Sequence, residues 1–329
     1  HPVRRRSNLT VMTGAQVTKI LFEDTRAIGV RMVRKGQTRD IIAAREIILS
    51  AGAIASPKIL MLSGVGPAAQ LKDHGISPVV DLPGVGENLQ EHPGIMMSEH
   101  VSQPTLNMET GPLKMIRHGL DFLLRGRGPA TASIGHAVAF VRVADDAPAP
   151  DVQISFTPIA FDFTESGIAL YHRSAVGMAV NVCRPETRGT ITLGSADPMA
   201  APVINHSLVG SDRDMQTMIR GCRMTRRIME SPAFARFSEG ERWPGKDVQT
   251  DSEWEAFIRQ NAFLMYHPVG TARMGVDAMA VVDARLRVRG VTGLRVADAS
   301  IMPTVPSANT NAPAIMVGEK ASDLILADA

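Results

Sequence analysis

The residue with the clearest chemical potential is His267, together with the loop around it. His267 stands in the stretch MYHPVGTARMG, residues 265–275. Because Pro268 bars the residue before it from α geometry, we expect His267 on a loop or extended turn with a fixed backbone. A histidine can move protons near neutral pH. A packing role is the alternative, but the rigid context favours a catalytic one, because catalytic groups need locked supports.

Asn309 and Asn311 form a second candidate group, just before a helix predicted over residues 312–326, with Pro313 near its first turn. An asparagine at a helix start is normally a cap. A helix start also carries partial positive charge, which would stabilise an electron-rich ring that turns anionic on reduction. Both interpretations stay open at this point.

Small residues and prolines precede these asparagines. The run Asp298-Ala299-Ser300 ends a predicted strand in small side chains, so a ligand could approach the backbone closely. Pro303 and Pro306 hold the next segment extended. We therefore expect a binding loop here.

Two glycine-rich stretches imitate a dinucleotide fingerprint, namely the one that begins at Gly64 and the one that begins at Gly84. A true fingerprint follows a strand and opens a helix, so that helix N–H groups meet the pyrophosphate. Gly64 instead follows a predicted helix, and Pro67 removes a donor. We interpret both stretches as turns.

The elements that must position these residues follow two different patterns along the chain. In the first part and the last part of the chain, the pattern predicts strands over residues 8–14, 16–23, 27–36, 47–49, 281–291 and 293–300. It also predicts a helix over residues 57–62, with Ser56 as N-cap, Pro57 as its first residue and Gly64 as its end.

The middle of the chain mixes strands with helices, which indicates an α+β domain with an antiparallel sheet. The expected strands are residues 137–143, 152–157, 175–183 and 189–193, and the expected helices are 113–124, 212–229 and 252–260.

Composition limits the classes of protein to which the chain can belong. The chain has 329 residues, 44% of them hydrophobic and 21% charged, as in ordinary globular proteins. A net charge of +2 argues against nucleic acid as a partner. No apolar run approaches the roughly 20 residues of a membrane span. Cys183 and Cys222 have no metal-like spacing, so we expect no metal and a cytoplasmic protein with reduced thiols. The chain begins with His1, which we interpret as a piece of a longer chain.

Taken in order, the motifs resemble those of the glucose–methanol–choline (GMC) oxidoreductases, especially the bacterial members that are similar to choline dehydrogenase and alcohol dehydrogenase. The blocks that carry the resemblance cover essentially the whole chain: GAIASPKILMLSGVGP (52–67), VGENLQEHP (85–93), PETRGTITL (185–193), YHPVGTARMG (266–275) and GLRVADASIMPTVPSANTNAPAIMVGEKASDLI (293–325).

The resemblance implies a fold of combined class, α/β plus α+β. Residues 1–95 and 265–329 would form parts of a discontinuous GMC-type FAD-binding domain, and residues 96–264 an antiparallel-sheet substrate domain. Family members begin with a strand–GxGxxG–helix unit that this chain lacks. By resemblance, roughly the N-terminal third is missing and would act as a partner segment.

The resemblance also assigns roles. His267 matches the active-site histidine and Asn309 the second catalytic position. The residues matched to FAD contacts are Val17, at adenine, and Ala51, Gly52, Asp298, Ala299, Thr310 and Asn311. For the substrate we assign Tyr266 and His136. Choline-specific relatives tend to carry a glutamate where His136 stands, and aromatic residues make up only 4% of the chain, so choline is disfavoured.

The implied activity is FAD-dependent oxidation of a primary alcohol to an aldehyde by hydride transfer to the flavin. His267 would be the general base, and Asn309 would donate a hydrogen bond to the developing alkoxide. The alternatives are a hydroxynitrile-lyase-like member that binds FAD without net redox, and an inactive fragment that requires an N-terminal partner chain. The alcohol, the electron acceptor and the oligomeric state stay open.

Overall fold

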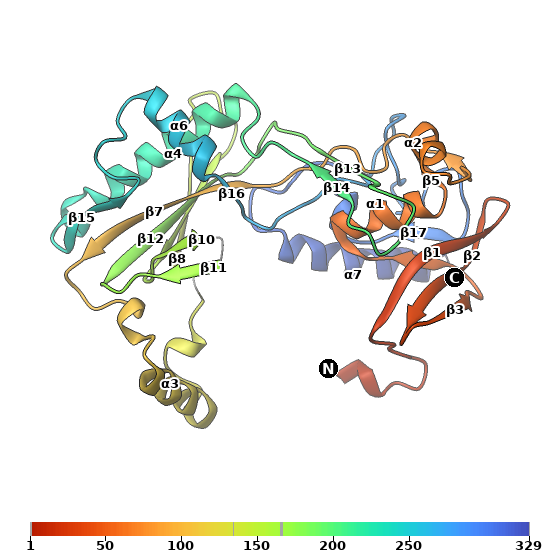
Figure 1. The fold of residues 1–329 in the computed structure, drawn as a ribbon, viewed down its shortest axis with the longest axis horizontal. Coiled ribbons are helices and arrows are strands. Elements are labelled where there is room, and N and C mark those ends of the chain that lie inside the picture. The colour runs from red at the N-terminus through yellow and green to blue at the C-terminus, as the bar shows by residue number, and fades with distance from the viewer. Residues whose placement is uncertain (1, 134, 165–166, 329) are drawn as a thin grey trace.

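Two hydrophobic cores organise the chain, which is described as a computed structural model over residues 2–133, 135–164 and 167–328. The first core joins side chains from residues 20–89, 191–193 and 269–321. The second core draws on residues 95–258. Figure 1 shows the two resulting bodies side by side, with long extended segments running between them. The division at residues 1–95, 96–264 and 265–329 stays a prediction; Ile191 and Leu193, inside the middle range, belong to the first core.

The first body opens with an antiparallel three-stranded sheet of β1 (Ala15–Glu23), β2 (Arg26–Arg34) and β3 (Gln37–Ile42). Tight turns join the strands, with Asp24 and Gly36 at positive φ. The strand predicted over residues 8–14 is wrong: this stretch pairs with no strand, and Leu9, Val11 and Met12 are exposed. Its apolar residues have no buried face to occupy, so the strand pattern finds no partner.

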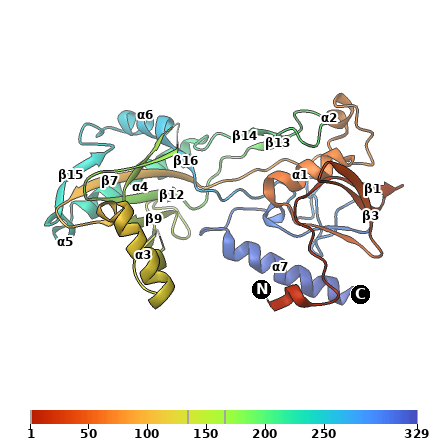
Figure 2. The same ribbon diagram turned by 60° about the horizontal axis from the view of Figure 1, so that its bottom comes forward.

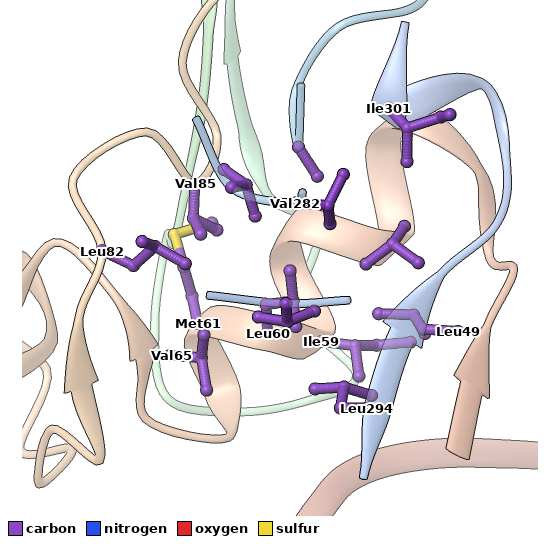
Figure 3. Packing of buried hydrophobic residues seen from close by; sticks show 14 of the residues in the cluster. Leu49, Ile59, Leu60, Met61, Val65, Leu82, Val85, Val282, Leu294 and Ile301 are labelled. Atoms are coloured by element: carbon purple, nitrogen blue, oxygen red, sulfur yellow. The ribbon is translucent and has the colours of Figure 1, made fainter. Parts of the chain in front are cut away.

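A parallel pair and a helix form the centre of the first body. Strand β4 (Ile47–Leu49) pairs with β17 (Leu294–Val296), and helix α1 (Gly52–Leu62) follows β4 directly. Figure 3 shows α1 side chains such as Leu60 and Met61 packed among Val282, Leu294 and Ile301. The helix is buried on most sides, which explains why its sequence is apolar nearly all round.

The predicted start of α1 was wrong by five residues, because Gly52 and not Pro57 is the first helical residue. Ser56 is buried inside the helix, where its hydroxyl donates to the Asp298 carboxylate at 2.5 Å instead of capping the helix. Gly64, at φ +85°, follows the helix as predicted. The stretch at Gly84 is a turn, as predicted. The stretch at Gly64 follows a helix and not a strand, as predicted, but after the turn at Gly64 it forms the short strand Val65–Gly66.

The remaining elements of the first body are short, apart from the last helix. They are η1 (Pro2–Arg5), β5 (Val65–Gly66), α2 (Ala68–Asp73), β6 (Val80–Asp81), β13 (Thr190–Thr192), β14 (Val203–Asn205), η4 (Ala299–Ile301) and the long helix α7 (Asn311–Ala327). The strand predicted over residues 281–291 is wrong, because that stretch forms only isolated bridges, such as the one between Val282 and Val288.

The second body is built on a six-stranded antiparallel sheet with the order β15-β7-β12-β9-β8, and β16 also pairs with β7. The strands are β7 (Pro93–Val101), β8 (Ala137–Val141), β9 (Val152–Thr157), β12 (Ala175–Val182), β15 (Ser238–Trp243) and β16 (Phe263–Leu264). Sequence patterning missed β7 and β15. Strand β7 is buried along almost its whole length and therefore lacks the polar alternation that marks a half-exposed strand.

Side-chain alternation gives this sheet two faces. Ile95, Met97 and Val180 belong to the second core, which packs against helices α4 (Asp212–Met229) and α6 (Asp251–Asn261). Both helices begin at the caps their sequences favour, Ser211 and the capping box of Thr250 with Glu253. Asn181, the residue after Val180 on β12, therefore points its side chain to the opposite face of the sheet.

The remaining elements of the second body are η2 (Leu106–Glu109), α3 (Pro112–Arg125), η3 (Pro129–Thr131), the antiparallel pair of β10 (Phe161–Thr164) and β11 (Gly167–Leu170), and α5 (Pro232–Ala235). Helix α3 projects from one end of the body, with Leu113, Leu123 and Leu124 exposed to solvent (Figures 1 and 2). No helix within the described ranges is long and apolar enough to cross a membrane.

Candidate active site

The loop that carries His267 follows β16, where the second body meets the first. Tyr266 has φ +60°, a left-handed conformation that costs a non-glycine residue about 1–3 kcal/mol. The next residue, His267, lies on a loop before Pro268, as the sequence predicts, and its side chain is buried. Strain of this kind persists only where the surroundings fix the backbone.

Glu91 fixes that backbone. Its carboxylate accepts the backbone N–H of His267 through both oxygens, at 2.8 Å each, and the N–H of His92 at 2.8 Å. Burial raises the pKa of Glu91 to about 7, and these N–H donors act in the opposite direction. The side chain thus links the His267 loop to the segment before β7.

The imidazole of His267 contacts a second histidine. The Nδ1 atoms of His92 and His267 are 2.9 Å apart, and Nε2 of His92 lies 3.1 Å from the carbonyl oxygen of Cys183. A carbonyl only accepts, so Nε2 of His92 carries the hydrogen. A neutral imidazole has one N–H, so Nδ1 of His92 accepts and Nδ1 of His267 donates to it.

That assignment leaves Nε2 of His267 without a hydrogen. Burial lowers the pKa of His267, and burial together with the nearby His267 lowers the pKa of His92 to about 4. Both rings are therefore neutral at pH 7. Within the part of the chain that the structure describes, Nε2 of His267 forms no hydrogen bond, so it is a free base.

The rest of the His267 loop is locked to α1. Pro57 has no N–H, so the carbonyl of Ala53 one turn earlier loses its helical partner. The Thr271 hydroxyl donates to that carbonyl at 2.5 Å. Val269 exchanges two backbone hydrogen bonds with Gln90. The proline inside α1 thus leaves a carbonyl without a partner, and the threonine of the loop supplies that partner.

Asn309 approaches the site from the last loop of the first body. Gln90, fully buried, holds this loop: its amide donates to the Pro303 carbonyl at 3.0 Å and accepts the Val305 N–H at 3.1 Å. Oδ1 of Asn309 accepts from Nε2 of Gln153 on β9 at 3.2 Å.

The start of α7 has no side-chain cap. The helix begins at Asn311, and the side chain of Thr310 before it makes no capping hydrogen bond. The Asn309 side chain bonds to β9 and not to the helix, so the capping interpretation finds no hydrogen bond among the described residues. The first N–H groups of this 17-residue helix keep their partial positive charge available.

Four of the residues assigned to the cofactor, namely Ala51, Gly52, Asp298 and Ala299, follow the carboxyl ends of β4 and β17. Val17 and Ala51 line a pocket of about 440 Å³ between β1, β4 and α1. Gly52 has φ +84°, with open space where a Cβ would stand. Such strand ends are where doubly wound α/β folds bind ligands.

Asp298 ties these strand ends together. Its carboxylate accepts from the Gly52 N–H at 2.9 Å, the Ser56 hydroxyl and the Ser300 N–H at 2.7 Å. The Ala299 carbonyl accepts the Gly270 N–H at 3.3 Å, which joins this corner to the His267 loop. The structure therefore places Ala51, Gly52, Asp298 and Ala299 in one corner.

The two residues assigned to the substrate lie at exposed positions. Tyr266 is 77% exposed beside His267. His136 is exposed at the entry to β8, and its backbone N–H donates to the Phe156 carbonyl at 2.9 Å. No contact between these two side chains is found within the described ranges.

Sequence reasoning missed Glu91, His92 and Gln153 as parts of this site. Glu91 and His92 stand next to each other in the quoted block VGENLQEHP, where an acid beside a histidine before a proline was an available signal. Their partner His267 lies 175 residues away, and no local pattern predicts that contact.

Comparisons with known proteins point to one family. Residues 1–94 match the N-terminal domain of GMC oxidoreductase, and residues 185–318 match its C-terminal domain. An oxygen-dependent choline dehydrogenase of Chromohalobacter salexigens is 42% identical over 98% of this chain and 58% of its own length. An alcohol dehydrogenase [acceptor] of Pseudomonas putida is 39% identical over 99% of this chain and 59% of its own length.

Among solved structures, a formate oxidase of Aspergillus oryzae, studied for modification of its FAD, matches with a TM-score of 0.90 and 28% identity. The match covers 99% of this chain and 62% of that one. The likeness confirms the predicted fold class, and the family is FAD-dependent. The chain spans about three fifths of the length of these relatives. The two matched ranges and the relatives indicate the same family, and the chain belongs to the GMC oxidoreductase family.

Proposed function

We propose that this chain is the catalytic part of an enzyme that oxidises a primary alcohol to an aldehyde, with His267 as general base. The observation that carries the proposal is the 2.9 Å contact between Nδ1 of His267 and Nδ1 of His92, from which we infer that Nε2 of His267 is unprotonated. A base must be neutral to accept a proton, and burial lowers the pKa of His267, which favours the neutral form at pH 7. Two of its relatives are named as a choline dehydrogenase and an alcohol dehydrogenase.

The residues present fit FAD. Val17 and Ala51 line an open pocket, Gly52 leaves room for close backbone approach, and the uncapped start of α7 at Thr310 and Asn311 offers N–H groups. Asp298 and Ala299 complete the corner next to the His267 loop. Bound FAD would supply the two-electron acceptor for the oxidation.

The proton of the substrate hydroxyl goes to Nε2 of His267. Its Nδ1–H keeps its hydrogen bond to His92 throughout, so the ring does not turn when it becomes charged. The Glu91 carboxylate, bound to the backbone N–H of the same residue, adds negative charge nearby when it is ionised. The chain thus holds the base in one tautomer and one orientation.

The oxygen that loses its proton becomes negative, and Asn309 donates to it through Nδ2. Oδ1 of Asn309 already accepts from Gln153, so the amide presents its nitrogen in another direction. One well-placed donor of this kind contributes about 10²- to 10³-fold in rate. Tyr266 and His136 contact the organic part of a small alcohol.

We further propose that activity requires an N-terminal segment of the kind that the longer relatives carry. The chain covers 58–59% of their length and contains no strand–GxGxxG–helix unit. We call this chain joined to such a segment the complete protein.

The test is the turnover of a panel of primary alcohols by the complete protein, with wild type and His267→Ala compared at matched FAD content. We expect the variant to lose about 10²- to 10⁴-fold in kcat, the range for a general base. His172→Phe, at an exposed histidine, is the matched control and should keep full turnover. Near-normal turnover of His267→Ala would show that His267 serves packing only.

A further inference from the structure

Gln153 is a buried amide that belongs to one body and bonds to a catalytic candidate of the other. It lies on β9 of the antiparallel sheet, is 3% exposed, and donates to Oδ1 of Asn309, 156 residues away in sequence. Sequence analysis gave it no role. A buried side-chain amide needs partners for its hydrogens, and this one uses them in a specific way.

Both hydrogens of the Gln153 amide are used. Nε2 lies 3.1 Å from Oγ of Ser155 and 3.2 Å from Oδ1 of Asn309. Ser155 is two residues along the same strand, so it points to the same face and anchors Gln153 there. The second hydrogen is then directed at Asn309.

The neighbouring strand does not compete for this amide. Asn181 stands opposite Gln153 in the register of β12 and β9, and it is 1% exposed. Neither side-chain atom of Asn181 has a hydrogen-bond partner among the described residues. Gln153 therefore contacts Asn309 and Ser155 and not its cross-strand neighbour.

An asparagine amide has one accepting and one donating end, so fixing one end fixes the other. A partner that donates turns Oδ1 of Asn309 toward β9 and sends Nδ2 elsewhere. A partner that accepts would do the reverse and leave a carbonyl oxygen facing the reacting group. The Asn309 side chain is exposed and does not cap α7. Among the described residues, Gln153 alone therefore sets the orientation of its amide.

We propose that Gln153 is a positioning residue that sets the orientation of the Asn309 amide, so that its N–H end and not its carbonyl end meets the alkoxide. The inference rests on the proposed role of Asn309 and adds the residue that enforces it. It also makes the donor depend on contact between the two bodies, since Gln153 and Asn309 come from different ones.

The first test compares Gln153→Glu with Gln153→Met in the complete protein. A glutamate carboxylate only accepts, so it turns the Asn309 amide over. We expect kcat to fall about 10²-fold, the scale for losing one donor. Methionine has a similar size and imposes no orientation, so the fall should be smaller, about 10-fold. In both variants KM should change less than kcat, because the hydrogen bond strengthens as charge develops.

The matched control is Asn181→Leu, which alters the residue opposite Gln153 in the same sheet without touching Asn309. It should keep the wild-type kcat. Melting temperature and FAD content are measured for each variant. If Gln153→Glu does not fold, Gln153→Met still decides: a folded Gln153→Met with the wild-type kcat overturns the proposal.

A double-mutant cycle separates this inference from the proposed function. In an Asn309→Ala background there is no amide to orient, so Gln153→Glu should lower kcat no further. If the two effects multiply instead, Gln153 acts through something else and the inference fails. If Asn309→Ala alone leaves turnover normal, the proposed role of Asn309 fails first.

Discussion

At the scale of single residues, two histidines with lowered pKa values divide one task. His92 bonds to a carbonyl and to His267, and this contact decides which nitrogen of His267 is free. Neither ring alone would specify a tautomer. In the proposed mechanism His267 acts as the base and His92 holds it, and the two roles give different experimental signatures.

The first signature is the pH dependence of turnover. His267 must be neutral to act, and burial lowers its pKa below the ordinary value of 6.5. Because a lowered pKa moves protonation to more acidic pH, the acid limb of kcat/KM should fall below pH 6.5. A profile of kcat/KM against pH for the complete protein checks this. An acid limb above pH 7 would mean that another group controls the rate.

The second signature comes from His92→Phe. The Nδ1–H of His267 loses its acceptor, the ring can turn or change tautomer, and kcat should fall by about 10- to 10²-fold, as when a supporting partner of a catalytic histidine is lost. FAD content should stay normal. Alcohol turnover at matched FAD content measures the effect. A variant as active as wild type would show that the tautomer is set elsewhere.

At the scale of elements, sequence patterns found most of the helices and about half of the sheet. Helices α4, α6 and α7 were predicted to within one or two residues, because their periodicity and end residues agree. Strand β7 escaped because burial on both faces removes its alternation. The predicted α1 starts too late, because proline favours the first position of a helix. Pro57 can lie inside the helix because the distant Thr271 bonds to the carbonyl that the proline leaves without a partner.

The same limit applies to the site. His267 and Asn309 stood out through their local motifs, since proline, glycine and a helix start leave marks in neighbouring residues. Glu91, His92 and Gln153 act through contacts across 156 to 176 residues, which no short motif records. The sequence therefore points to the residues proposed to do the chemistry, and not to the residues that hold them.

The contact between Pro57 and Thr271 yields a stability prediction. Thr271→Val keeps the shape but leaves the Ala53 carbonyl buried without a partner, which should cost about 1–3 kcal/mol in the free energy of unfolding. Thr271→Ser, which keeps the hydroxyl, should cost less. Thermal or urea unfolding of the variants measures the difference.

A second substitution makes this test specific. In Thr271→Val with Pro57→Ala, the new N–H of residue 57 can bond to the Ala53 carbonyl and should restore part of the stability. Pro57→Ala would then help the Thr271→Val variant more than it helps wild type. Equal effects of Pro57→Ala in both backgrounds would contradict the paired account.

At the scale of the whole molecule, the chain exposes surfaces that proteins normally bury. Ile315 and Met316 on the first turns of α7, and Leu113, Leu123 and Leu124 on α3, are all more than half exposed. The pocket beside Val17 and Ala51 is open along β4, which has only one partner strand among the described residues. The His267 loop is thus in place, and the corner that we propose for the cofactor is only partly enclosed.

The last prediction follows from that incomplete corner. The 329-residue chain, refolded and given FAD, should bind it more weakly than micromolar, that is by less than about 8 kcal/mol. Phosphate groups are held best by a strand–turn–helix start, and the described residues offer the cofactor an open pocket and the start of α7 instead. Flavin fluorescence quenching or calorimetry measures the affinity, and the complete protein is the control. Micromolar or tighter binding by the chain alone would show that residues 1–329 contain the full cofactor site, and would contradict the proposed need for an N-terminal segment. Weak binding that becomes tight when that segment is supplied as a separate polypeptide would support the proposed need directly.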